Sequence, residues 1–163
     1  SMGGSDKYDI TSRIVKQLKK TKFDFSAFIV LGKFYSNSKK IHHILQNDKR
    51  FILVDNTKNL HEIIIKCQFG IISFGITVYE AVALNIPTLV ISHSFENHFS
   101  AKRIEKYSWY EYLGKYDNIN YSKVIDKIIS NLTQKKRLKI KKPNLIDSKG
   151  PNRICKKILE LKM

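Results

Sequence analysis

Two patterns of apolar residues alternate along the chain. Short continuous runs of Ile, Val, Leu and Phe are typical of strands buried on both faces of a sheet. Between them, apolar residues recur every three or four positions, which predicts helices that bury one face. The runs lie at 27–31, 51–54, 70–73 and 88–91. This alternation predicts an α/β fold, a Rossmann-like parallel sheet with helices on both faces, formed by residues 1–163 as a single domain.

The helix signals set approximate boundaries. Asp9 or Thr11 is suited to be the N-cap of the first helix. Pro87 ends a central helix, because proline biases the residue before it away from the α conformation. The aromatic-rich segment 107–113, which ends at Gly114, predicts a short outer strand. The expected helices are 10–18, 41–45, 60–66, 77–84, 97–106, 121–132 and one after Pro151 with Ile154, Ile158 and Leu161 on one face.

The stretch from Gly70 to Glu80 carries the main functional signal. It reads as a buried strand that turns through Phe74-Gly75 into a helix. Such a junction directs free backbone N–H groups and the positive end of the helix dipole at one place, which favours an anion such as phosphate. Glu80 lies three residues after Thr77, where its carboxylate could accept hydrogen bonds from both hydroxyls of a ribose. These features suggest a nucleotide; the alternative is an ordinary α/β junction whose glutamate only complements the helix dipole.

Gly3-Gly4-Ser5-Asp6 is a second glycine turn that leads into a helix. A turn of this kind usually follows a strand, yet only Ser1 and Met2 precede it here. Two interpretations stay open. Either the strand belongs to a region further upstream, or the glycine turn is a flexible leader.

The net charge of +16 comes mostly from lysines spread along the whole chain. A dedicated nucleic-acid-binding protein more often concentrates arginines and aromatic residues on one element. We therefore do not expect nucleic acid as the main partner, although the charge would permit weak, salt-sensitive association. The densest basic cluster, at 135–142, is expected to be a solvated loop.

The sequence contains neither an apolar run long enough to span a membrane nor an N-terminal signal-peptide pattern. Cys67 and Cys155 lie far apart without paired spacing, which argues against a disulfide framework and against a zinc site. We therefore expect a cytoplasmic protein that carries no metal and no other cofactor.

The order of four segments resembles the C-terminal, donor-binding lobe of GT-B-type nucleotide-sugar enzymes. The nearest similarity is to the UDP-sugar hydrolase of pseudaminic acid synthesis and to spore-coat polysaccharide proteins; the peptidoglycan N-acetylglucosaminyltransferase is more distant. A further segment is similar to the Asp-Gly-x-Gly-x-x-Arg motif near the C-terminal end of the hydrolase group. It is Asp147-Ser148-Lys149-Gly150-Pro151-Asn152-Arg153-Ile154, in which Ser148 replaces the usual first glycine. The four segments are Gly3-Gly4-Ser5, Gly75-Ile76-Thr77-Val78-Tyr79-Glu80, Ile86-Pro87 and Glu96-Asn97.

The resemblance implies a role for each segment. The backbone and hydroxyl of Gly3-Gly4-Ser5 would contact the diphosphate of UDP or a UDP-sugar, together with the Gly75-Ile76-Thr77 turn. Glu80 would hold the ribose hydroxyls. The backbone at Val54 and Asp55 would bind the uracil edge, and Glu96 and Asn97 would face the donor sugar. The helix N-termini and backbone N–H groups supply the positive field that a diphosphate needs, so the site requires no metal.

One part of the enzymes in question is absent from the sequence. Their cleft forms between two lobes, and the usual base, often a histidine, comes from the N-terminal lobe. The chain would then be one lobe of a longer glycosyltransferase or UDP-sugar hydrolase that acts in surface polysaccharide or nonulosonic acid synthesis. Alone, this lobe would be inactive, and the resemblance assigns it no catalytic residue. His93 and His98 lie near the site in sequence, but histidines in such loops are more often incidental. Two alternatives are a partner lobe of a split glycosyltransferase, in which a separate chain supplies the N-terminal lobe, and a basic nucleic-acid-binding module.

Overall fold

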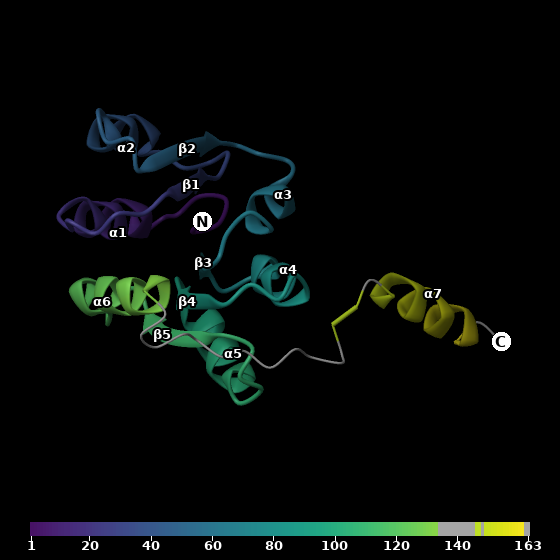
Figure 1. The fold of residues 1–163 in the computed structure, drawn as a ribbon. Helices are drawn as coiled ribbons and strands as arrows, with labels where there is room; N and C mark the ends of the chain where they lie inside the picture. Colours follow the sequence, from purple (N-terminus) through teal and green to yellow (C-terminus); the bar gives the residue numbers. More distant parts are fainter. Residues whose placement is uncertain (134–145, 148, 162–163) are drawn as a thin grey trace.

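Strands and helices alternate along the chain in the computed structural model, which describes residues 1–133, 146–147 and 149–161 (Figure 1). The basic cluster at 135–142 lies outside the described residues. The strands are β1 (Ala27–Leu31), β2 (Phe51–Asp55), β3 (Gly70–Ser73), β4 (Thr88–Ser92) and β5 (Glu111–Lys115). The helices are α1 (Ile10–Lys19), α2 (Ser38–Leu45), α3 (Leu60–Ile64), α4 (Ile76–Ala83), α5 (Phe95–Glu105), α6 (Tyr121–Leu132) and α7 (Gly150–Glu160).

All strand pairs are parallel. β1 pairs with β2, and β3, β4 and β5 pair in that order. The expected Rossmann-like α/β fold, with parallel strands flanked by helices, is confirmed. The strands form two sheets rather than one continuous sheet, because β1 and β3 do not pair with each other.

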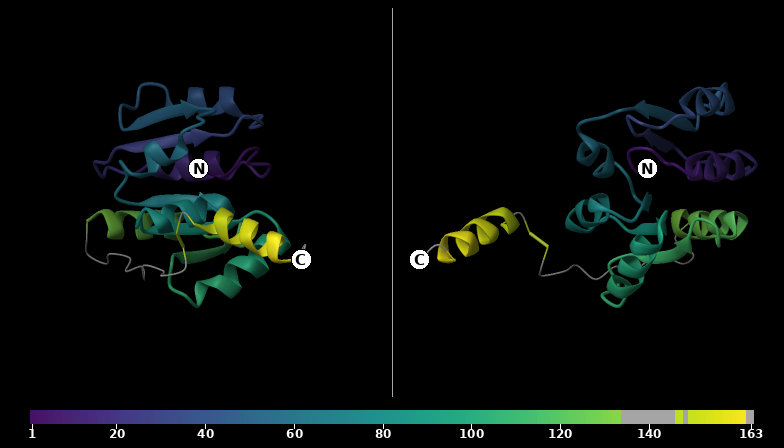
Figure 2. Two further views of the ribbon diagram at one scale, coloured as in Figure 1. Left: turned by 90° about the vertical axis from the view of Figure 1, so that its right-hand side faces the viewer. Right: turned by 180° about the vertical axis from the view of Figure 1, so that it is seen from behind.

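The helices form a layer on each side of the strands (Figures 1 and 2). α1 and α6 pack on one side of β4, against Leu89 and Ile91. α3, α4 and α5 pack on the other side, against Val90. β4 is buried along its whole length, as its continuous apolar run predicts. A third cluster joins α1 and α2 to β1 and β2.

The bounds of several elements differ from those expected, and α5 and β5 are two examples. α5 begins at Phe95 instead of residue 97, because the Ser94 hydroxyl accepts the N–H of Asn97 at 3.1 Å and caps the helix. β5 begins at Glu111 instead of residue 107. Gly114 lies inside β5 and not at its end. It takes a φ of 115° at the place where the pairing of β5 with β4 shifts register, as at a β-bulge.

The last helix is present as α7, but it begins at Gly150, before Pro151 and not after it as expected. None of its described side chains is buried, and Figures 1 and 2 show it standing apart from the layers. Ile154, Ile158 and Leu161, expected on one face, are 62%, 51% and 79% exposed. Among the described residues, no helix combines the length and apolar character needed to cross a membrane.

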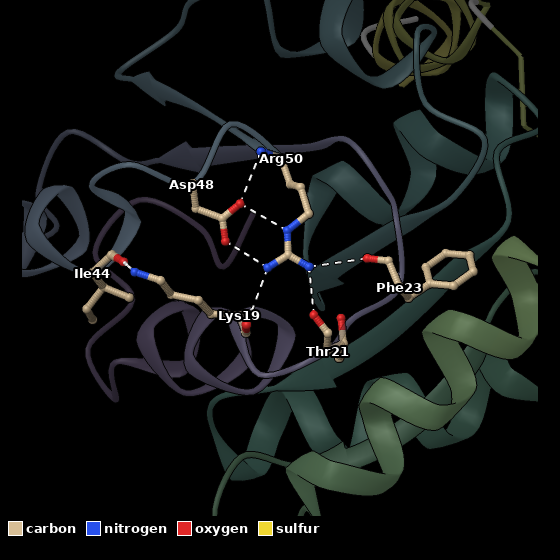
Figure 3. A network of polar contacts seen from close by, with 6 residues as sticks. All are labelled: Lys19, Thr21, Phe23, Ile44, Asp48 and Arg50. Carbon is tan, nitrogen blue, oxygen red and sulfur yellow. Dashed lines mark hydrogen bonds and ion pairs between the residues drawn. The ribbon is translucent and has the colours of Figure 1, made fainter.

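Arg50 ties together the segments that enter β1 and β2 (Figure 3). Its guanidinium forms two hydrogen bonds with the Asp48 carboxylate, 2.9 Å from Nε to Oδ1 and 2.7 Å from Nη2 to Oδ2. It also donates to the carbonyl oxygens of Thr21 at 2.8 Å, Phe23 at 3.2 Å and Lys19 at 3.3 Å. Because Arg50 directly precedes β2, this network lies at the amino ends of the strands, away from the loops that follow them.

Candidate functional site

The Gly3-Gly4 turn bridges the carboxyl ends of β1 and β3. On the β1 side, the N–H of Phe34 donates to the carbonyl oxygen of Gly4 at 2.9 Å. A Cβ atom built on Gly32 would lie only 2.3 Å from the same oxygen, so the two backbones are in direct contact. On the β3 side, a Cβ atom built on Gly3 would lie 3.2 Å from Oγ of Ser73. The fold therefore brings the first glycine turn next to the strand that leads into the second.

The N-terminus of α4 is open. Gly75 is its N-cap residue, and no side chain caps the helix. The Val78 N–H donates to the Gly75 carbonyl at 3.1 Å, but within the described part of the chain no hydrogen bond uses the N–H groups of Gly75, Ile76 or Thr77. The exposed N–H groups and the helix dipole together suit an anion. Glu80, one turn further along α4, is also exposed.

The protein itself does not require glycine at position 75. Its φ of 172° is extended backbone that any residue adopts. A Cβ atom built there would have no heavy atom within 4 Å. A Cβ atom built on Gly4 would likewise have no heavy atom within 4 Å. Glycine at such a position leaves the backbone accessible to a ligand that approaches closely.

The N-terminus of α1 is closed. Asp6 folds back on the helix, and its Oδ1 and Oδ2 accept the N–H groups of Ile10 at 2.9 Å and Thr11 at 2.8 Å. Asp9 occupies the N-cap position, as expected, but its side chain makes no capping hydrogen bond. Burial raises the pKa of Asp6, an effect that these hydrogen bonds oppose. A diphosphate at the first turn would therefore meet the exposed backbone and Ser5, and not the free end of α1.

Asn97 connects the start of α5 to the turn before α4. Its Nδ2 donates to the carbonyl oxygen of Phe74 at 3.1 Å and lies 3.3 Å from Nε2 of His93. The N–H of Phe74 in turn donates to the carbonyl of Ile91 at 2.9 Å. Glu96 is exposed, and hydrogen bonds at the helix start, to its own N–H and to Ser94, lower the pKa of its carboxyl. The Glu96-Asn97 pair thus lies beside Gly75.

Val54 and Asp55 lie at the end of β2, on the far side of β1. Asp55 is opposite Leu31 in the ladder, and the N–H of Asn56 donates to Leu31 at 3.0 Å. This pattern turns the backbone of Val54 towards β1 and that of Asp55 towards the open edge. Of the two residues, Asp55 therefore has the main-chain groups that a ligand could reach. Its carboxylate accepts from Nε2 of His42 at 3.0 Å.

The two histidines near the site differ in their surroundings. Nδ1 of His98 lies 2.6 Å from the Tyr112 hydroxyl, which also contacts the hydroxyl of Ser92. Nδ1 of His93 is buried without a hydrogen-bond partner among the described residues. Within the part of the chain that the structure describes, neither histidine contacts a carboxylate that would orient it as a base. Groups of three or more potential metal ligands are also absent from the described residues.

Four residues that shape this site are not among the binding residues predicted from the sequence. Asp6, Gly32, Ser73 and Ser94 hold its loops in place. Ser94 carries a recognisable signal, since a serine before Phe95 is a preferred N-cap. Gly32 ends an apolar run, which indicates only a turn. The roles of Asp6 and Ser73 depend on the contacts of the folded turns, for which the sequence has no pattern.

No protein-family model matches the chain, and no solved structure matches it. Over 94 residues the chain is 27% identical to Uncharacterized protein MJ1062 of Methanocaldococcus jannaschii. The match covers 56% of this chain and 19% of that protein, so the chain spans about a fifth of the length of the curated relative it matches.

Proposed function

We propose that the chain is the nucleotide-sugar-binding lobe of a two-lobe, GT-B-type enzyme and that it binds UDP or a UDP-sugar along the carboxyl ends of its strands. The observation that carries the proposal is the pairing of Gly75 with an open helix N-terminus. Three unused N–H groups meet there at a glycine that the fold itself does not need. A diphosphate lying against the backbone accounts for both properties.

The neighbouring residues support the same ligand. Glu80 is exposed one turn beyond the phosphate position, where a ribose would follow a diphosphate. Asn97 is held beside Gly75 by its bond to Phe74, within reach of a sugar on the far phosphate. Gly3, Gly4 and Ser5 lie across the end of β3 from the same turn. At the carboxyl end of β2, the main-chain groups of Asp55 that face away from β1 could bind the uracil ring.

Exposed apolar side chains favour a partner lobe, on the same polypeptide or on a separate one. Phe34 follows the Gly32 turn and is 74% exposed, and Ile76 at the start of α4 is 79% exposed. Phe95 and Phe99 on α5 are 65% and 67% exposed, with ring centroids 6.0 Å apart. Large apolar groups beside a polar site are typical of a surface that another domain covers. In this arrangement the second lobe would supply the catalytic base.

Calorimetric titration of the chain with UDP tests the proposal. Gly75→Ala places a methyl group where the diphosphate would lie, and Glu80→Ala removes the ribose acceptor, so each should weaken UDP binding at least about tenfold. Glu160→Ala, which removes an exposed glutamate from α7, is the matched control and should bind as the unaltered chain does. Uridine should bind more weakly than UDP and should be insensitive to Gly75→Ala. UDP affinity that survives both substitutions, or no UDP binding at all, would reject the assignment.

A further inference from the structure

The backbone groups on the facing edges of β1 and β3 point into a gap between the two sheets. In a parallel ladder, alternate residues direct their N–H and C=O groups to opposite sides. The N–H of Ala27 donates to Arg50, on the β2 side, so Phe28 and Val30 direct theirs away from β2. On the other edge, the N–H of Gly70 donates to Pro87, on the β4 side. The alternation therefore turns Ile71 towards β1.

Ser1 already pairs with β3 in this gap. Its amino nitrogen donates to the carbonyl oxygen of Ile71 at 3.0 Å, and the N–H of Ser73 donates to the carbonyl of Ser1 at 3.1 Å. Two bonds from one residue to the neighbours of Ile72 are the pattern of a parallel bridge. Three residues later the same chain contacts the end of β1, through Gly4 and Gly32. A single chain thus spans the gap, whose width at this end is that of one strand.

A cavity continues the gap beneath Ser1. Its volume is about 540 Å³, and both edges, from Ala27 to Val30 and from Gly70 to Ile72, line it. Both helical layers contribute apolar side chains to its walls. These are Leu18, Ile128 and Leu132 from α1 and α6, and Ile63, Ile64 and Ala81 from α3 and α4. A strand placed there would be buried on both faces, so its sequence would be a continuous apolar run.

We propose that this gap holds a sixth, central parallel strand of about five residues, formed by the polypeptide that precedes Ser1 and is joined to it by a peptide bond. The two sheets then become one, in the order β2, β1, new strand, β3, β4, β5. The amino group of Ser1 supports this, because burial lowers its pKa to about 6. A peptide N–H would donate the same bond to Ile71 without a charge to desolvate. The proposal does not depend on the nucleotide site.

Two extended chains test the proposal. One carries Ile-Leu-Val-Val-Leu directly before Ser1. The other carries Ile-Leu-Val-Pro-Leu, which places a proline where the ladder needs an N–H for the carbonyl of Phe69. The apolar extension should raise the Tm by about 5 °C or more over the unextended chain. It should also slow the amide hydrogen exchange of Phe28, Val30 and Ile71 at least tenfold and protect the Cys67 thiol, which lines the cavity, from a disulfide reagent. The proline version should have none of these three effects.

The outcomes separate this strand from other occupants. If the two extensions had equal effects, burial of apolar side chains without strand pairing would explain the higher Tm and the slower exchange. That result would overturn the proposal. The proposal would also fail if neither extension changed the Tm or the exchange. If the unextended chain is a dimer whose Phe28 and Val30 amides become more protected as its concentration rises, a second copy fills the gap instead.

Discussion

The side-chain amide of Asn97 donates to the carbonyl oxygen of Phe74 at 3.1 Å, which fixes the start of α5 against the turn that opens α4. Asn97→Ala removes this bond and leaves the carbonyl oxygen of the buried Phe74 without that donor. We expect a loss of about 1 kcal/mol in the free energy of unfolding and, if a UDP-sugar binds here, a further loss of affinity for the sugar nucleotide over UDP. Chemical denaturation and calorimetry with both ligands measure the two effects. Unchanged discrimination between UDP and the UDP-sugar would exclude Asn97 from the sugar site.

Glycines 32 and 75 should respond in opposite ways to alanine. A Cβ atom at Gly32 would meet backbone atoms of Gly4 at 2.3 Å and 2.4 Å, which cannot move as the tip of a side chain can. Gly32→Ala should therefore destabilise the fold by about 2 kcal/mol or more. Gly75→Ala meets open space, so it should cost no more than about 1 kcal/mol, the penalty of alanine at a helix N-cap, while losing UDP affinity. A stability loss at Gly75 equal to that at Gly32 would contradict the structural reason given for the site.

Asp6 should matter for stability and Ser5 should not. Asp6→Ala leaves the N–H groups of Ile10 and Thr11 without their acceptors, so the loss should be about 1–2 kcal/mol. Ser5 is exposed, and Ser5→Ala should leave the denaturation midpoint unchanged. Both midpoints come from the same urea titration. If Asp6→Ala were as stable as Ser5→Ala, water would be capping α1 as well as the carboxylate does.

Arg50 should act on the fold alone. Arg50→Ala removes the bidentate bond to Asp48 and the donors to three carbonyl oxygens, all at the strand ends away from the candidate site. The expected cost is about 2–4 kcal/mol. Arg50→Lys keeps the charge but not the planar fork, so it should recover only a small part of that cost. Where either variant remains folded, its UDP affinity should be unaltered. A changed UDP affinity would show that the Arg50 network influences the candidate site at the opposite ends of the strands.

Apolar runs such as 70–73 and 88–91 are enough to predict the parallel strands, because only a strand buried on both faces needs such a composition. The positions of Gly3 beside Ser73 and of Asn97 beside Phe74 also follow, since turns after parallel strands meet at one edge of the sheet. The interior of each loop does not follow. Asp6 closes α1 only because Asp6 and Asp9 take φ values of 38° and 53°, conformations that a string of polar residues does not specify. The split of the strands into two sheets does not follow from the sequence either, although the glycine turn at Gly3 indicates that a strand should precede it.

The amino group of Ser1 should make stability depend on pH. Its pKa is about 6 in the folded chain, lowered by burial, against about 8 when unfolded. Between these values the unfolded chain binds more protons than the folded one, so stability falls as the pH falls from about 8 to 6, by about 2–3 kcal/mol for this group. Acetylation of Ser1 removes the charge and should abolish this part of the slope. Apart from Asp6 and Cys67, which interact with the amino group, the other titrating groups keep the same surroundings in both chains. Urea denaturation of the free and acetylated chains at pH 6 and pH 8.5 gives the difference directly. Parallel profiles would mean that the amino group is solvated, and the argument for an uncharged peptide N–H facing Ile71 would lose its electrostatic support.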